Sequence, residues 1–435
     1  MTVRAEQLPV QVRGCRSRSG PLTYGQAYIW NSIRSQALED QHNFHMNIAL
    51  PPHSTPADVR HALSVLLSAH ESLRATLRPE PSGPPSQVVA GDGELPLTVV
   101  ESDHPGPAAL AELRELVTGQ GFDHYREWPI RVGVLCSGRR AHWLVLMLSH
   151  LASDASGARI LRRHLLSVLD GAPDADGIDL SCRQPLEQAA HERSPDGARG
   201  ARRALDYWRH QLQEVPVFDR PAVEPGQPRF WQGLLESPGL GRAAPALAER
   251  AGISTYSVLT AAVALVLGRL AGRDRYCLAV MCSNRHTPAL RDSVMNLPQR
   301  VPLTVDLTGS FTDIARRAHT AALNGYRFGM YDPAAARALI SSVGEQRGGV
   351  LDFATTFNAL KPLWRDEEQA GRPPASASSF HWIRKTATDI ERLRFADYFA
   401  PDRIALYADT SYYPLTEIES CLRDVERTVV QAEVA

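Results

Sequence analysis

The chain has 435 residues, of which 43% are hydrophobic and 22% are charged, and its formal net charge is −1. This composition is typical of a folded globular protein and argues against disorder. The length favours two domains, because a single hydrophobic core rarely grows to this size. The balanced charge leaves no positive excess to neutralise a phosphate backbone, so we expect no nucleic acid partner.

No apolar stretch near the start has the form of a secretory signal. The longest uncharged run, residues 251–268, is too short in its apolar part to cross a bilayer. The six cysteines are scattered without metal-ligand or redox spacing. We therefore expect a cytoplasmic protein with no bound metal or cofactor and no membrane contact.

Strand and helix signals alternate in the first half of the chain, which is typical of an α/β arrangement. Apolar residues at helical spacing predict the helices, and Ser54 or Thr55 can cap the first of them. A turn-like sequence at 137–140 predicts that the flanking strands form a hairpin. The predicted elements are a helix over 57–77, strands over 130–135 and 143–148, and a helix over 156–169.

The second half starts after a segment without clear periodicity. Residues 194–203 are rich in Arg, Gly, Ser and Pro and predict an exposed crossing, and the four prolines of 216–228 predict a linker. We place the domains at 1–215 and 216–435. In the second domain we expect helices over 244–251, 256–270 and 417–430, strands over 276–281, 352–358 and 403–408, and a long polar loop over 361–379.

One short segment carries residues suited to chemistry. The predicted strand 143–148 is followed by Ser149 and His150, and Asp154 stands where it can cap the next helix. Histidine suits proton transfer near neutral pH. A histidine and an aspartate at this spacing also fit a purely structural role, and no further ligands are present for a metal site.

Other segments of the sequence favour the catalytic interpretation of His150. Residues 22–30 (LTYGQAYIW) resemble the S-x-A-Q-x-R-x-W segment that opens the condensation domains of nonribosomal peptide synthetases, within the chloramphenicol-acetyltransferase-like superfamily. Residues 69–77 resemble R-H-E-x-L-R-T-x-F, and 122–131 resemble F-D…P-L-x-R. Residues 149–155 (SHLASDA) fall on the motif H-H-x-x-x-D-G. These segments occur in the family's order.

The resemblance continues beyond this motif. Residues 207–221 are similar to the family's Y-W…L…P…D-R-P connection between lobes. Asn284 and Arg285, followed by residues 294–300, are similar to its G-R…F-V-N-T-x-x-x-R region. The resemblance covers residues 22 to about 300, and the pattern after Tyr407 also fits.

The resemblance implies a fold of two chloramphenicol-acetyltransferase-like lobes in a V-shaped pseudo-dimer with a central tunnel, and a floor loop and a latch in the second lobe. His150 is then the active-site imidazole, and Asp154 is a structural carboxylate that pairs with Arg285 across the lobes. Such a buried pair holds its neighbours in register more than it adds stability. Side chains expected to line the tunnel or contact substrate are Ser149, Ala155, Gly157, Tyr24, Gln26 and Asn296.

Two residues depart from the family motif. Ser149 stands where the family has its first histidine, and Ala155 stands where it has a glycine. The glycine lets a backbone amide approach the reacting carbonyl, so a methyl group at 155 narrows that approach. Gly157 offers compensating backbone freedom.

The resemblance also implies an activity. We expect a free-standing enzyme that takes an acyl or aminoacyl group from the phosphopantetheine thioester of an acyl or peptidyl carrier protein in trans. The acceptor is a small-molecule or tethered amine or alcohol, and the product is an amide or an ester in natural-product biosynthesis. Three alternatives stay open: a coenzyme A-dependent acyltransferase of the same superfamily, an epimerase of the same fold, and a non-catalytic domain that recruits a carrier protein or tailoring enzyme.

Overall fold

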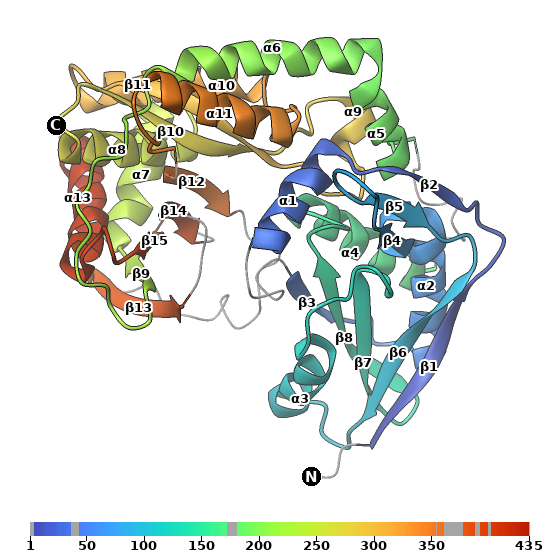
Figure 1. Cartoon of the computed structure of the whole chain (residues 1–435). Helices are drawn as coiled ribbons and strands as arrows, with labels where there is room; N and C mark the ends of the chain where they lie inside the picture. Colours follow the sequence, from blue (N-terminus) through green and yellow to red (C-terminus); the bar gives the residue numbers. More distant parts are fainter. Residues whose placement is uncertain are drawn as a thin grey trace. The chain divides into compact units, whose positions relative to one another are not determined.

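The computed structural model describes residues 4–35, 43–171, 181–353, 355–360, 377–387, 392–398 and 402–434. The chain is a mixed α/β protein and divides into two compact units (Figure 1). The first unit comprises Met1–Gly197 and Arg285–Leu297, and the second comprises Ala198–Asn284 and Pro298–Ala435. The units differ from the predicted lobes in two ways: residues 198–215 belong to the second unit, and the first unit includes a short segment from far along the chain.

The first unit contains a five-stranded sheet in the order β1-β6-β7-β8-β3 and a three-stranded sheet in the order β2-β5-β4. Its strands are β1 Arg4–Val12, β2 Arg18–Pro21, β3 Asn43–Ala49, β4 Ala75–Arg78, β5 Ser86–Val89, β6 Gly93–Glu101, β7 Ile130–Ser137 and β8 Arg140–Ser149. Its helices are α1 Tyr24–Ser35, α2 Pro56–Ala69, the 3-10 turn η2 Glu71–Arg74, α3 Pro107–Thr118, α4 Ala155–Leu169, α5 Pro185–Arg193 and α9 Pro288–Arg291.

Helices cover both faces of the larger sheet in the first unit. Helix α3 packs on β7 and β8, and a Cβ added at Gly133 in β7 would meet Leu113 and Val117 of α3. Helix α2 packs on β1, β7 and β8 and also on α4. The predicted hairpin is confirmed, since β7 and β8 pair antiparallel around Gly138 at φ 58°.

The second unit is built on a mixed seven-stranded sheet in the order β11-β10-β12-β14-β15-β9-β13. Its strands are β9 Phe230–Glu236, β10 Arg275–Cys282, β11 Gln299–Asp306, β12 Thr355–Leu360, β13 Ser379–Thr386, β14 Leu393–Tyr398 and β15 Arg403–Asp409. Its helices are α6 Pro195–Leu212, which begins in the first unit, α7 Pro238–Ala251, α8 Thr255–Leu270, α10 Phe311–Tyr326, α11 Pro333–Gln346 and α13 Leu415–Val434.

Strand β10 shows how the second unit buries both faces of its sheet. Tyr276, Leu278 and Val280 belong to the cluster formed with α7, α8, α10 and α13. Cys277 and Ala279 belong to the cluster formed with α6 and α11. Alternation of side chains along the strand produces this division. A strand buried on both faces has the continuous apolar run seen in this sequence.

The first predicted helix was too long. Helix α2 begins as predicted, with Thr55 and Asp58 in a capping box, but it ends at Ala69 because His70 has an extended backbone at φ −115° and ψ 102°. Leu73 and Leu77 are buried from η2 and β4 instead. The apolar spacing continues past the end of the helix because η2 and β4 also bury their leucines in the core.

The segments predicted as an exposed crossing and as a linker are more ordered than expected, although 194–203 does contain the boundary between the two units, after Gly197. Residues 194–203 begin helix α6, which buries Ala201, Ala204 and Trp208 and leaves its arginines outward. The proline-rich segment 216–228 is held by the second unit, where the Phe218 amide donates to Val350 (2.8 Å) and Arg220 pairs with Glu417 (2.7 Å).

The remaining predictions for the second half mostly hold. Helices α8 and α13 and strands β10 and β15 lie within one to four residues of the predicted bounds, while α7 begins earlier and β12 later than expected. The predicted loop 361–379 lies outside the described residues up to 376. Within the described part of the chain, no single helix is long and apolar enough to span a membrane. The bent pair α7–α8, with 108° between its helices, passes the same test by length and composition only.

Candidate active site

The candidate site is the turn that joins β8 to α4. Side chains alternate along β8, so Leu148 and Ser149 point to opposite faces of the sheet. Phe44 in the neighbouring strand β3 is paired with Leu148, and its ring lies 4.7 Å from the ring of His150, centroid to centroid. His150 is therefore presented on the face of Leu148 and Phe44, directly beyond the strand end.

The ring of His150 has a defined tautomer. Nδ1 lies 3.2 Å from the carbonyl oxygen of Ser153. A carbonyl oxygen only accepts hydrogen bonds, so Nδ1 of the neutral ring carries the proton and Nε2 carries the lone pair. Burial lowers the pKa of His150 below its ordinary value of 6.5, against opposing effects of the Ser153 hydrogen bond and the Asp154 charge. At neutral pH the imidazole is thus a base with its acceptor nitrogen defined.

Asp154 performs two tasks at the start of α4. Its backbone is extended at φ −99° and ψ 179°, and its Oδ1 accepts the amide of Gly157 at 2.8 Å as an N-cap. Both carboxylate oxygens also accept from Nη2 of Arg285 at 2.9 Å, and both side chains are buried. The predicted ion pair is present. Arg285 belongs to the same compact unit as Asp154, although it lies far along the chain in the half predicted as the second lobe.

Arg285 organises the segment that follows it. Its Nη1 donates to the carbonyl oxygens of Leu290 (3.0 Å) and Ser293 (2.8 Å), and its Nη2 donates to that of Met295 (3.2 Å). Oδ2 of Asp154 accepts the amide of Leu297 at 3.2 Å. The guanidinium and the carboxylate together hold the loop 285–297 against the first turn of α4. The planar guanidinium has five N–H donors and can bond several oxygens at once, whereas a lysine ammonium group is a compact point charge.

This loop reaches the histidine through Asn296. The Asn296 side chain is buried, and its Nδ2 donates to the carbonyl oxygen of His150 at 2.8 Å. Nε2 of Gln26 lies 3.4 Å from the next carbonyl, that of Leu151, and 3.2 Å from Oε1 of Gln87. Asn296 and Gln26 therefore hold the backbone on which His150 is mounted. Their predicted contact with substrate stays a prediction.

Two glycines leave room for close neighbours around this turn, a backbone carbonyl at Gly25 and a side-chain hydroxyl at Gly157. A Cβ at Gly25 in α1 would lie 2.2 Å from the carbonyl oxygen of Asn296, and a Cβ at Gly157 would lie 2.4 Å from Oγ of Ser153. Gly157 is an ordinary helical residue in the first turn of α4. The structure shows close packing at this residue, and its compensating backbone freedom stays a prediction.

The other predicted residues lie around the same turn. Ala155 is the first residue of α4 and is half-buried. Its backbone is helical, a conformation that alanine adopts readily. Tyr24 starts α1, where its amide donates to Oε2 of Glu192 (2.7 Å) and its hydroxyl donates to the carbonyl of the same residue (3.3 Å). Ser149 is fully buried, and its Oγ lies 2.8 Å from Nε2 of His124.

Phe44 and His124 were missed by the sequence reasoning. Phe44 lies in a strand-like run of the sequence, but only its pairing with Leu148 places it beside His150. His124 lies 25 positions before Ser149, in the segment 122–131, whose resemblance to the family rests on its Phe-Asp and Pro-Ile-Arg residues. Strand alternation indicates which face Ser149 occupies, but it does not indicate which loop reaches that face.

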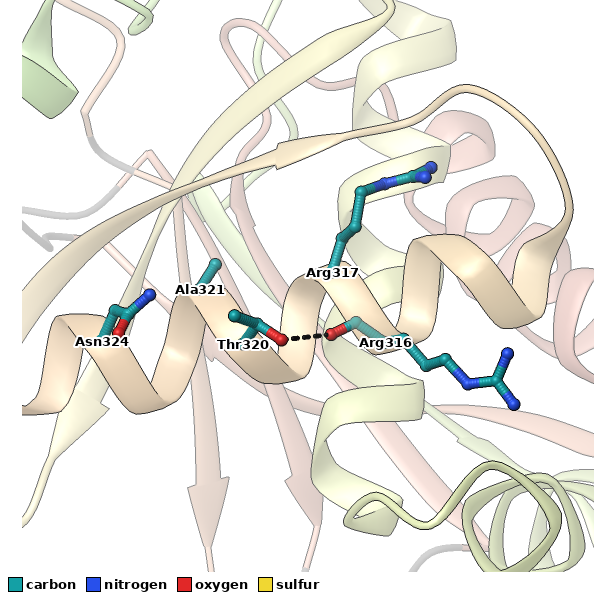
Figure 2. A pocket seen from close by; sticks show the side chains of 5 residues that line it. All are labelled: Arg316, Arg317, Thr320, Ala321 and Asn324. Atoms are coloured by element: carbon teal, nitrogen blue, oxygen red, sulfur yellow. Dashed lines mark hydrogen bonds between the residues drawn. The ribbon is translucent and has the colours of Figure 1, made fainter.

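The hollow drawn in Figure 2 is a different feature. It lies on one face of α10 and is lined by Arg316, Arg317, Thr320, Ala321 and Asn324. Arg316 and Arg317 lie 3.8 Å and 3.7 Å from the carboxylates of Asp313 and Asp306. None of the predicted site residues lines this hollow. Among the residues that the structure describes, no three His, Cys, Asp or Glu side chains form a cluster that could hold a metal ion.

Similarity to known proteins identifies the family of the chain. The family model for the condensation domain matches residues 18–333. With the α/β units and the His150 turn in place, this match shows that the chain belongs to the condensation-domain family. The family forms amide or ester bonds in nonribosomal peptide and related natural-product biosynthesis.

Curated relatives include chondramide synthase cmdD of Chondromyces crocatus, 28% identical over 307 residues, which are 67% of this chain and 8% of that protein. Phosphinothricin tripeptide synthetase PhsB of Streptomyces viridochromogenes is 26% identical over 324 residues, which are 71% of this chain and 27% of that protein. The chain therefore spans about a quarter or less of the length of these relatives.

Solved structures share the fold at low sequence identity. SgcC5 from Streptomyces globisporus matches with a TM-score of 0.69 and 18% identity, covering 95% of this chain and 99% of that one. A condensation domain that mediates chain release from the enacyloxin polyketide synthase matches with a TM-score of 0.73 and 19% identity, covering 95% and 82%. The X-domain from teicoplanin biosynthesis matches with a TM-score of 0.66 and 19% identity, covering 97% of both chains. The chloramphenicol-acetyltransferase-like fold is thus confirmed.

Proposed function

We propose that the chain transfers an acyl or aminoacyl group from the phosphopantetheine thioester of a carrier protein to an amine or alcohol. In this proposal His150 manages the proton of the attacking nucleophile. The observation that carries it is the hydrogen bond from Nδ1 to the carbonyl of Ser153, which leaves the lone pair on Nε2. Membership of the condensation-domain family supports the reaction class.

The proposed step requires neither a covalent enzyme intermediate nor a metal ion, because a thioester is already activated. The acceptor nitrogen or oxygen attacks the thioester carbonyl while Nε2 of His150 takes its proton. The carbon–sulfur bond then breaks, and the thiolate leaves and receives the proton back from the imidazolium. The new bond is an amide or an ester. For an amine, holding the two reactants in contact supplies much of the rate, whereas an alcohol depends more on the base.

The cofactor in this scheme belongs to the partner. The phosphopantetheine arm is carried by the carrier protein, and we propose that this chain binds it only as part of the donor. We also propose that Tyr24 and Ala155, which are half-buried beside the turn, contact the substrate. The tunnel in which donor and acceptor would meet is part of the same proposal.

The experiment is a transfer assay with an acyl-loaded carrier protein, supplied as a separate chain, and a panel of amine and alcohol acceptors. Intact-protein mass spectrometry follows the loss of the acyl group from the carrier. We expect His150→Ala to slow transfer by about 100-fold or more, as for removal of a general base. His45→Ala is the matched control, because His45 lies on the adjacent strand β3 and is exposed. Normal turnover of His150→Ala would contradict the proposal.

A second candidate is a recruitment domain that binds a carrier or tailoring enzyme without transferring the acyl group. The departures Ser149 and Ala155 from the family motif favour it. The teicoplanin X-domain was solved in complex with OxyB, which is the kind of assembly this candidate requires. A carrier that binds the chain and keeps its acyl group with every acceptor would support recruitment. Transfer from a soluble acyl-coenzyme A instead of the carrier would indicate the coenzyme A-dependent alternative.

A further inference from the structure

The buried hydrogen bond between His124 and Ser149 lies beneath the His150 turn and is not used in the proposed reaction. His124 belongs to the connection between α3 and β7, and Ser149 ends β8. Nε2 of His124 lies 2.8 Å from Oγ of Ser149. His124 is 7% exposed and Ser149 is 0% exposed. The pair is shielded from solvent, so it does not act on a substrate directly.

The same hydroxyl also holds the backbone beyond His150. Oγ of Ser149 accepts the amide of Leu151 at 3.2 Å. The amide of Ser149 donates to the carbonyl of Pro129 at 3.1 Å. The Ser149 side chain therefore connects the residue after His150 to His124, and the Ser149 backbone connects the strand end to Pro129. A change in the χ1 rotamer of Ser149 would move this oxygen and release the Leu151 amide.

His124 is itself held firmly in place. Its carbonyl accepts the amide of Leu77 in β4 at 2.7 Å. Its ring packs edge-on against Trp30, with centroids 6.2 Å apart, and beside Phe122, with centroids 6.0 Å apart. Burial lowers the pKa of His124 to about 4, so the ring is neutral near pH 7. A neutral imidazole can form a hydrogen bond with a hydroxyl group, and no charge is then buried.

These contacts suggest why a serine can stand at position 149, where the family motif has a histidine. The resembling motif has a histidine there, and this chain has a serine whose hydroxyl meets an imidazole from another loop. We propose that His124 is a positioning residue for His150, supplying through Ser149 the support that the motif's first histidine would supply. This inference rests on the proposed function of His150. The inference concerns the orientation of the His150 ring, which can be measured without measuring turnover.

The first test compares two substitutions of similar size. His124→Leu removes the hydrogen bond but fills the space, whereas His124→Gln retains a nitrogen near the position of Nε2. We expect His124→Leu to lower kcat about tenfold with KM nearly unchanged, and His124→Gln to recover most of that loss. His319→Leu is the matched control, because His319 also bonds a buried serine, Ser257, at 3.0 Å, but in the second unit. We expect it to reduce stability without this effect on kcat.

The second test does not depend on turnover. The ¹⁵N shifts of the His150 ring, assigned with His150→Ala, report the proton on Nδ1. We expect one tautomer in the wild type, His124→Gln and His319→Leu, and a mixture in His124→Leu. An unchanged tautomer in a folded His124→Leu variant would overturn the inference, even if the chain proves to have no transfer activity. Loss of transfer in His150→Ala together with an unchanged kcat in His124→Leu would also overturn it.

A reciprocal exchange gives a third readout. His124→Ser with Ser149→His returns the imidazole to position 149 and leaves a hydroxyl opposite it. Ser149→His alone places two imidazoles in a space built for one and is expected to be poorly folded or inactive. The inference predicts that the double variant has at least fivefold higher kcat than either single variant. A double variant no better than the singles would contradict the exchange of roles.

Discussion

At the scale of single residues, the site depends on which nitrogen or oxygen each buried group offers. His150 has its proton on Nδ1 because a backbone carbonyl faces that atom. Phe44 packs on the ring and Asn296 holds the His150 carbonyl. The histidine is therefore oriented by its neighbours before any substrate arrives, and the proposed role of a base requires such preorganisation.

The lowered pKa of His150 predicts the pH dependence of the proposed transfer. The base works when neutral, so kcat should rise with pH through a pKa lower than the ordinary 6.5 and be level above it. Single-turnover rates between pH 5 and 8 with one loaded carrier measure this. A rate that keeps rising above pH 7 would show that another group limits the reaction.

Buried neutral histidines also make stability depend on pH. In the folded protein the pKa of His124 is lowered to about 4 and that of His70 to about 3. In the unfolded chain both histidines have the ordinary pKa of 6.5. As pH falls below 6.5 the unfolded state takes up these protons first, so stability is lost until the folded pKa is reached. Each group contributes a slope of at most about 1.4 kcal/mol per pH unit.

Urea unfolding at pH 7 and pH 5 tests this prediction. His124→Gln keeps a polar partner for Ser149 but does not titrate, so its stability should fall less between the two pH values than that of the wild type. Equal losses in the two proteins would contradict the shifted pKa of His124.

At the scale of elements, the site is the meeting of a strand end, a helix start and an inserted loop. Asp154 caps α4 and also accepts from Arg285 and Leu297, so one carboxylate joins all of them. Gly25 brings α1 against the same loop. At Gly25 the two backbones are in contact, and the Cβ of any other residue would meet the carbonyl oxygen of Asn296.

The buried pair predicts an asymmetric response to mutation. Arg285→Met leaves the Asp154 carboxylate without its counter-charge and removes the donors that hold 290–295, and we expect a loss of about 3–5 kcal/mol in the free energy of unfolding. Asp154→Asn in the same chain should recover part of that loss, because the amide still caps Gly157. Urea unfolding of both variants measures the recovery. Additive losses would show that the two groups are not coupled.

Close packing at Gly25 predicts a second effect. Gly25→Ala places a methyl group 2.2 Å from the Asn296 carbonyl oxygen, and we expect destabilisation of about 1–3 kcal/mol. Gly200→Ala in α6 is the control, because nothing lies within 4 Å of its added Cβ and alanine favours the helix by about 0.5–1 kcal/mol. Thermal melts that rank the variants in the opposite order would contradict the packing.

At the scale of the whole molecule, the first unit is discontinuous in sequence. Residues 285–297 leave the second unit after Asn284, whose backbone is left-handed at φ 56°, and complete the site in the first unit. We expect Asp154→Ser to cost several kcal/mol in the full chain, since serine keeps the cap but loses Arg285. In a fragment of residues 1–197 the same change should cost less than about 0.5 kcal/mol.

Thermal melts of the full chain and the fragment, with and without Asp154→Ser, make this comparison. A fragment that does not fold would itself show that the inserted loop is integral to the first unit. Equal losses in the two settings would show instead that Asp154 acts only through local capping.

The sequence by itself determined the family, most of the helix and strand positions, the His150–Asp154 spacing and the partner Arg285. These features are visible because motif spacing and apolar periodicity are local properties of the chain. The end of α2, the helical start of α6 and the docked segment 216–228 were not visible, since tertiary burial overrides local propensity there. The tertiary structure alone decided that Arg285 joins the first unit, that Phe44 and Asn296 hold His150, and that Ser149 meets His124. Each of these pairs is distant in sequence, and only chain folding brings its atoms within hydrogen-bonding or van der Waals range.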